Sequence, residues 1–365
     1  MRILTVALSD SIHTARWLSQ TSDTGWDIHL FPSIDCGLLH PDISNATVYH
    51  SIYAGKKGAH LDVSRKGIPV FSRNVALGTT LILRKLWPGY TVQRLTRVIE
   101  KIRPDIIHSL EIQAAGYITL EAKKRFRGAF PPWIVTNWGS DIYLFRQFPE
   151  HEAKIREVLG ACDYYTCECE RDVRLAREYG FAGHPFPVSP NAGGFDIRRI
   201  AKLRQEGPAS SRRMVMLKGY HHWAGRALVG LKALTLCADV LKGYTVGIYS
   251  ASRRVVSAAK HFERSSGIRT MIIPRDTLHE EILKLHGRAR ISIGLSMGDG
   301  LSTSFLEAVA MGSFPVQSWT ACADEWVEDG KTGLLVPPED PDAVAQAIRR
   351  ALTDNTMVDQ ASELN

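Results

Sequence analysis

Long apolar runs are missing from this sequence of 365 residues, and so are the marks of an exported chain. No stretch approaches the roughly 18 apolar residues of a transmembrane helix, which excludes an integral helical membrane protein. The opening MRILTVALSD has too short an apolar run for a secretory signal and is typical of a first buried strand. The sequence therefore predicts a cytoplasmic protein.

Cysteine is scarce, and the cysteines are not arranged as metal ligands. The close set Cys162, Cys167 and Cys169 lacks paired CxxC spacing, and the other three lie far apart at 36, 237 and 322. Free thiols in a reducing cytoplasm are expected rather than a metal site. The sequence also has no short internal repeat and no low-complexity tract.

Positive charge is concentrated in one part of the chain. Residues 54–127 contain 15 Lys or Arg against 5 Asp or Glu, whereas the whole chain has a net charge of +7, so the remainder is slightly acidic. A basic sector favours a polyanionic neighbour, and because no RNA or DNA module is recognisable, we expect an anionic membrane surface rather than nucleic acid. A basic surface that faces only solvent is the alternative.

Buried strands alternate with amphipathic helices along the first half of the chain. Strands are expected at 2–8, 27–31, 105–110 and 133–138, and helices at 13–20, 91–102, 113–126 and 170–180. From 183 to 213 the chain becomes rich in Pro, Gly and Ser, and the alternation then restarts. The pattern predicts two Rossmann-like α/β domains, 1–188 and 189–365, each a doubly wound parallel sheet, facing each other across a central cleft.

The segment GDGLSTSFLEAVAMG, 298–312, follows a strand expected at 290–296. Its helix begins near 302–304, where unpaired backbone N–H groups and the helix dipole favour a phosphate. Asp299 and Glu307 are roughly 10 Å apart at about 1.5 Å per helical residue, which is close to the length of a nucleoside-diphosphate sugar from ribose to sugar. The alternative is that Asp299 caps the helix and Glu307 is a polar residue at its rim.

These residues also carry a resemblance. DGLSTSFLEAVAMGSFPVQS…EWVEDGKTGLLVPPEDPDAVAQAI resembles the carboxyl-terminal signature of retaining glycosyltransferase family 4 (glycosyl transferases group 1), in which two Glu are separated by seven residues. Further segments are similar to other parts of that family: SDSIHTARWL, PDIIHSL, VTNWGSDI, VSPNAGGFD and MLKGYHHWAGRALVGLKAL. The resemblance spans nearly the whole chain and implies the GT-B fold.

The resemblance implies a role for each matching residue of the second domain. Glu307 would bind the ribose hydroxyls of the donor, and Asp299 would contact the transferred sugar. Lys218 and Arg226 would neutralise the leaving diphosphate in place of a divalent metal, so neither a metal nor another cofactor is expected. The sugar and the diphosphate would be held by backbone N–H groups of Gly300, Leu301, Ser302 and Thr303.

In the first domain, His108 is expected to end a strand and to face the sugar or the acceptor hydroxyl. His13, Arg16 and Asp141 would contact the acceptor. The sequence departs from the family pattern in three ways. Asp299 stands where the family has Glu, the lysine of the basic pair precedes the arginine, and the chain ends before the last helix that usually crosses back to the first domain.

Together these features predict a retaining, metal-independent glycosyltransferase of the hexosyltransferase type (EC 2.4). It would move a sugar from a nucleoside-diphosphate sugar to a hydroxyl of a glycan or lipid-linked acceptor, in cell-surface polysaccharide or glycolipid synthesis. Its expected location is the cytoplasm, peripheral on the inner face of the plasma membrane. Two alternatives are a non-catalytic nucleotide-sugar binding protein and a GT-B-fold sugar-nucleotide epimerase.

Overall fold

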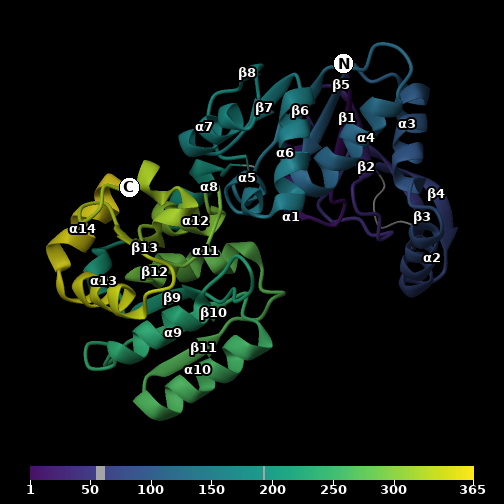
Figure 1. Ribbon diagram of the computed structural model, residues 1–365. Helices are drawn as coiled ribbons and strands as arrows, with labels where there is room; N and C mark the ends of the chain where they lie inside the picture. The colour runs from purple at the N-terminus through teal and green to yellow at the C-terminus, as the bar shows by residue number, and fades with distance from the viewer. Residues whose placement is uncertain (55–61, 192–193) are drawn as a thin grey trace. The chain divides into compact units, whose positions relative to one another are not determined.

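The computed structural model describes residues 1–54, 62–191 and 194–365, and the chain divides into two compact units (Figure 1). Unit 1 spans 1–194 and unit 2 spans 195–365, with the boundary at 194 where the sequence placed it at 188. Residues 55–61 of the basic sector and 192–193 of the expected linker lie outside the described residues.

Unit 1 is built on a parallel sheet of eight strands in the order β4-β3-β2-β1-β5-β6-β7-β8. The order reverses between β1 and β5, which pair in parallel with Ile3 opposite Ile106. In such sheets ligands bind outside the carboxyl ends of the strands at this reversal. The strands are β1 (Arg2–Ala7), β2 (Asp27–Pro32), β3 (Ala46–Ala54), β4 (Val63–Val70), β5 (Ile106–Leu110), β6 (Trp133–Thr136), β7 (Tyr164–Thr166) and β8 (His184–Pro185).

Helices cover both faces of this sheet because successive side chains of each strand point to opposite faces. On β1, Leu4 and Val6 pack in the cluster that contains the residues of α3, α4 and α6, whereas Ile3 and Ala7 pack with α1. The helices are α1 (Ile12–Ser19), α2 (Arg73–Leu86), α3 (Tyr90–Ile102), α4 (Tyr117–Arg125), α5 (Ser140–Tyr143), α6 (Pro149–Ala161) and α7 (Glu170–Glu178), with a π-helix, η1 (Ile112–Gly116), before α4.

Unit 2 has a parallel sheet of six strands in the order β11-β10-β9-β12-β13-β14. Its order reverses between β9 and β12, where Val215 pairs with Ile291. The strands are β9 (Met214–Lys218), β10 (Thr245–Tyr249), β11 (Arg269–Ile272), β12 (Ile291–Gly294), β13 (Phe314–Ser318) and β14 (Leu334–Val336). Both sheets are therefore doubly wound, and the predicted fold class is confirmed.

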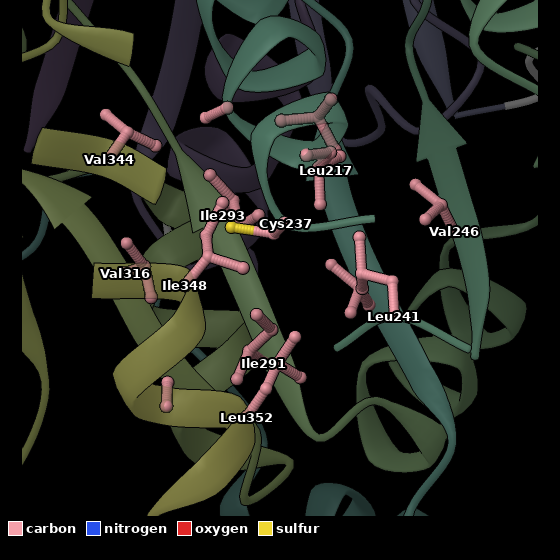
Figure 2. Close-up of a cluster of buried hydrophobic side chains, with 14 of the residues drawn as sticks. Leu217, Cys237, Leu241, Val246, Ile291, Ile293, Val316, Val344, Ile348 and Leu352 are labelled. Atoms are coloured by element: carbon pink, nitrogen blue, oxygen red, sulfur yellow. The ribbon is translucent and has the colours of Figure 1, made fainter. Parts of the chain in front are cut away.

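The main core of unit 2 lies on the sheet face covered by α9, α10, α13 and α14. Figure 2 shows Leu217, Ile291 and Ile293 of the strands beside Ile348 and Leu352 of α13. Met216, which lies next to Leu217 on β9, points to the opposite face of the sheet, and α11 covers that face. The helices are α8 (Ile197–Leu203), α9 (Ala227–Leu236), α10 (Arg253–Ser266), α11 (His279–Arg288), α12 (Thr303–Ala310), α13 (Pro341–Thr353) and α14 (Asn355–Leu364).

Helix α13 has a side-chain cap at its start. Asp340 is the N-cap residue, its side chain accepts hydrogen bonds from the N–H groups of Asp342 and Ala343, and Pro341 occupies the first helical position. An Asp at the N-cap followed by Pro at the first helical position is a common start of an α-helix. Among the described residues, no helix is both long enough and apolar enough to cross a membrane.

Candidate functional site

Unit 2 gathers several polar side chains at the carboxyl edge of its sheet, around the reversal of strand order. Lys218 ends β9 and Tyr249 ends β10, while β12 leads through the loop 295–302 into α12. The residue before that helix, Ser302, is its N-cap residue, so the alternative in which Asp299 caps α12 is wrong. The reversal of strand order between β9 and β12 brings these strand ends together at one edge of the sheet.

The N-terminus of α12 carries a cation instead of a side-chain cap. Ser302 makes no side-chain cap hydrogen bond to the helix, and its hydroxyl lies 2.8 Å from Ser304 Oγ and accepts a hydrogen bond from Lys218 Nζ at 3.3 Å. The Lys218 ammonium also lies 4.9 Å from the centre of the Tyr220 ring. An ammonium beside first-turn N–H groups at the positive end of a helix dipole is an arrangement that attracts phosphate.

Glu307 lies about one turn into α12 and is buried, so the alternative in which it sits at the helix rim is wrong. Its Oε1 is 2.6 Å from Nε2 of His279, the first residue of α11, whose side chain is half-exposed. A charge-assisted hydrogen bond of this length fixes the carboxylate in one orientation. The sequence did not predict His279.

A buried histidine and a tyrosine lie behind this carboxylate. His286 is buried, and its Nδ1 lies 2.9 Å from Ser292 Oγ, while its Nε2 has no partner among the described residues. Burial lowers the pKa of His286 to about 4, so the ring is neutral near pH 7. Burial also raises the pKa of Tyr249, whose hydroxyl lies near Ser304 and whose ring packs edge-on against His286.

The second cation predicted from the sequence lies in a different setting. Arg226 donates from Nε to Glu339 Oε1 at 2.9 Å and from a terminal nitrogen to the carbonyl groups of His222 and Gly225. Its backbone N–H donates to the carbonyl of Leu295, the first residue after β12. The structure therefore places Lys218 at the N-terminus of α12, whereas the Arg226 guanidinium is paired with Glu339.

The loop before α12 is closely packed. Gly298, Gly300 and Leu301 are buried, and Leu301 packs with Phe305 and Val327 in a small apolar cluster. Asp299 between the two glycines and Thr303 at the start of the helix are half-buried. Leu301 thus anchors the loop to unit 2 through its side chain.

Unit 1 has its own group of polar residues at the carboxyl edge of β1, β5 and β6. His108 is not at the end of its strand as expected, because β5 continues through Leu110, which pairs with Thr136. The His108 ring is buried, with Nε2 2.7 Å from Thr136 Oγ1 and the Trp17 ring packed edge-on against it. Burial lowers the pKa of His108 to about 3, so the imidazole is neutral.

Glu111, which the sequence reasoning missed, directly follows β5. Its backbone has φ 91° and ψ 153°, a region populated almost only by glycine, and the π-helix η1 starts at the next residue. The N–H groups of Ala114 and Ala115 lie near its carboxyl group and favour its ionised form, while its buried Oε1 has no hydrogen-bond partner in the described part of the chain. Backbone strain and π-helices cluster at functional sites.

Burial and the neighbouring charge of Asp141 raise the pKa of Glu111 to about 8. The ordinary pKa is 4.5, so between pH 4.5 and 8 the group is ionised in the unfolded state but still protonated in the folded state. The free energy of unfolding therefore falls as the pH rises through this range. We therefore expect Glu111→Gln to raise the melting temperature relative to the wild type more at pH 9 than at pH 5. Melting curves of both proteins test this, with exposed Glu100→Gln as the control. Equal differences at the two pH values would contradict the shift.

The residues predicted to bind the acceptor lie on neighbouring segments. Asp141 is buried, and its Oδ2 accepts hydrogen bonds from the N–H groups of Ile112 and Trp138, so it holds η1 against the loop after β6. The His13 ring lies 5.6 Å from the Trp138 ring, and Arg16 is half-buried one turn further along α1. Trp138 Nε1 is buried and has no partner among the described residues.

Two family models match the chain. One, described as glycosyl transferases group 1, matches 231–354, a range that includes His279, α12 with Glu307, and α13. The other, described as glycosyl transferase 4-like, matches 89–163, which contains His108, Glu111 and Asp141. These two matches agree with the family resemblance found in the sequence. No curated protein matches it by sequence.

Solved structures support the fold. A sucrose-phosphate synthase from Thermosynechococcus elongatus is 16% identical over all of this chain and 92% of that one, with a TM-score of 0.68. Anabaena HepE in complex with UDP and glucose is 16% identical over 100% and 94% of the two chains, with a TM-score of 0.64. A trehalose-6-phosphate synthase studied for glycosyltransfer with retention is 15% identical over 99% and 93%, also at 0.64. The chain has the GT-B fold of these glycosyltransferases.

Proposed function

We propose that this glycosyltransferase uses a nucleoside-diphosphate sugar as donor and transfers the sugar with retention of anomeric configuration. The observation that carries the proposal is the arrangement at one sheet edge of unit 2. Lys218 lies on the N-cap serine of α12, and buried Glu307 lies one turn further along the same helix. UDP in the HepE structure and retention in the work on trehalose-6-phosphate synthase support the choice of donor and of stereochemistry.

In this proposal Glu307 binds the ribose diol, and His279 positions its carboxylate. The diphosphate lies at the N-terminus of α12 against the N–H groups of Ser302 and Thr303, and the sugar lies toward Asp299, Gly300 and Leu301. Lys218 neutralises the diphosphate. Arg226 can assist only if it exchanges Glu339 for the ligand.

The chemistry then needs no protein base. The acceptor hydroxyl oxygen bonds to the anomeric carbon from the face that the leaving group departs from, while the bond from that carbon to the diphosphate oxygen breaks. The acceptor proton passes to an oxygen of the leaving phosphate. Negative charge grows on the diphosphate as this bond breaks, and the Lys218 ammonium and the α12 dipole stabilise it. No divalent metal is required in this scheme.

We assign the acceptor to unit 1. His13, Arg16 and Glu111 are the side chains we expect to contact it, while the buried His108 supports Thr136 and Trp17, and Asp141 holds the loops. His13→Ala should raise the KM for the acceptor about 10-fold by removing one hydrogen bond and leave donor affinity unchanged. Steady-state kinetics with exposed His184→Ala as the matched control test this. A changed donor affinity with an unchanged acceptor KM would contradict the assignment.

A lipid-linked acceptor and a peripheral position on an anionic membrane belong to the same proposal. The basic sector supports them, because anionic lipid headgroups attract clustered Lys and Arg. The synthesis of a surface polysaccharide or glycolipid would bring such an acceptor to the cytoplasmic face of the membrane. We expect no role for nucleic acid.

The experiment that tests the donor site is a thermal-shift panel of UDP, GDP, ADP and CMP with their common sugar conjugates. Stabilisation by one nucleoside diphosphate, and more strongly by one of its sugar conjugates, is the expected result because a ligand that binds only the native state raises the melting temperature. No stabilisation by any member of the panel would sink the proposal.

A further inference from the structure

Helix α2 of unit 1 exposes most of its large apolar side chains to solvent, whereas a helix that only covers a sheet would bury them. Its two buried residues are the small Ala76 and Thr80, whereas Ile82 is 58% and Leu86 is 78% exposed. Val75 and Leu81 are also exposed. A surface helix normally turns its large apolar residues toward the core, so this helix presents an apolar surface that the described residues of the unit leave exposed.

The segments on either side extend this apolar surface. α2 packs beside β3 and β4 (Figure 1), and β4 is the edge strand of the sheet. Ile68 on β4 is 63% exposed, Phe71 between the strand and the helix is fully exposed, and Trp87 after the helix is half-exposed. Isolated exposed apolar residues are common, but so many in one segment of about 20 residues mark an interaction surface.

The same segment is strongly basic. Between 62 and 90 the sequence has five Lys or Arg and a single acidic residue, Asp62. Lys66, Arg73, Arg84 and Lys85 are exposed, and none of them forms a salt bridge within the described residues. Arg84 and Lys85 lie in the last turn of α2, directly before Trp87. Large apolar residues beside Lys, Arg and Trp are the composition of helices that lie in a membrane interface.

We propose that α2 and the adjoining edge of β4 lie in the headgroup region of an anionic bilayer. The exposed apolar side chains would insert among the acyl chains, and the four exposed cations would bind lipid phosphate groups. Charge decides between this occupant and a second copy of the chain, since a symmetric dimer would bring two such basic surfaces together. The proposal rests on the peripheral location proposed above but not on the transfer chemistry.

The mode of binding differs from that of a basic surface alone. Charge attraction is lost at high salt because the Debye length shortens to about 3 Å at 1 M, whereas apolar insertion is not screened. We therefore expect binding to anionic vesicles to weaken with salt but to persist in part. Substitution of the apolar residues should remove that residual binding.

The test is flotation with two kinds of vesicle. One is phosphatidylcholine alone, and the other contains about 30% phosphatidylglycerol, an anionic lipid that attracts basic segments. The wild type should float with the mixed vesicles only. Ile82→Ser with Leu86→Ser, and separately Arg84→Gln with Lys85→Gln, should each weaken binding about 10-fold or more. The matched control is Leu278→Ser in unit 2, because Leu278 is exposed but is flanked in the sequence by Asp276, Glu280 and Glu281.

Both double variants change exposed side chains, so their melting temperatures and their thermal shifts with the donor should match the wild type. Absence of the wild type from the mixed vesicles at low salt would overturn the proposal, and so would unchanged flotation of the Ile82→Ser, Leu86→Ser variant. A dimer in gel filtration that this variant dissociates, without any vesicle binding, would assign the surface to a second copy instead. None of these outcomes alters the donor measurement, so failure here is distinguishable from failure of the proposed function.

Discussion

Glu307→Gln should weaken binding of the nucleoside diphosphate about 100-fold, or about 2.7 kcal/mol, while the fold is retained. The amide has the same shape as the carboxylate but lacks its charge, and hydrogen bonds to a charged group contribute about 1.5–3 kcal/mol each against about 1 kcal/mol for neutral ones. His279 fixes the carboxylate at 2.6 Å, so the wild-type group is already oriented before the donor binds. Isothermal titration with the diphosphate identified in the panel gives the affinities.

Glu328→Gln is the matched control, because Glu328 is an exposed glutamate of the same unit that pairs only with Lys331 among the described residues. It should bind the diphosphate as the wild type does. Equal affinity of Glu307→Gln and the wild type would mean that the buried carboxylate supports α11 and α12 without touching the ribose.

Lys218→Met should lower kcat about 10²- to 10³-fold and raise the KM for the donor much less. Removal of one preorganised group that stabilises charge in a transition state has this typical effect on rate. The charge on the diphosphate grows as the bond to the sugar breaks, so the ammonium near Ser302 contributes most at that point. Initial rates over a range of donor concentrations separate the two parameters.

Lys232→Met on the exposed side of α9 is the control and should leave both parameters unchanged. EDTA should also leave the wild-type rate unchanged, because in the proposed scheme Lys218 supplies the charge that a divalent ion would otherwise provide. A rise in KM with an unchanged kcat would restrict Lys218 to binding the donor in the ground state. Loss of the rate in EDTA with recovery in Mg²⁺ would contradict the metal-independent scheme.

The sequence predicted the centres of both sheets well, because fully buried parallel strands are continuous apolar runs. The strands expected at 2–8, 105–110 and 290–296 correspond to β1, β5 and β12 within three residues at each end. The outer part of unit 1 was not predicted. β4 is a mostly exposed edge strand, and α2 turns its large apolar residues outward, so neither has the burial pattern on which the prediction relied.

The candidate site could be predicted only where one segment carries it. The α12 loop and Glu307 are contiguous in the sequence, and the strand–loop–helix pattern placed them correctly. His279 reaches Glu307 from 28 residues earlier, and Glu339 holds Arg226 from 113 residues later, so no spacing rule signals either contact. Glu111 had a signal, since it follows the strand that contains His108, but its strained backbone and π-helix are visible only in the structure.

The measurement that tests the central claim most directly is release of nucleoside diphosphate from the donor that binds best, followed with labelled sugar. The account predicts diphosphate release together with the appearance of the sugar on an acceptor, or slowly on water, with the anomeric configuration of the donor. Tight binding of the donor without any release would identify a nucleotide-sugar binding protein, and would contradict the proposal that this chain transfers sugar.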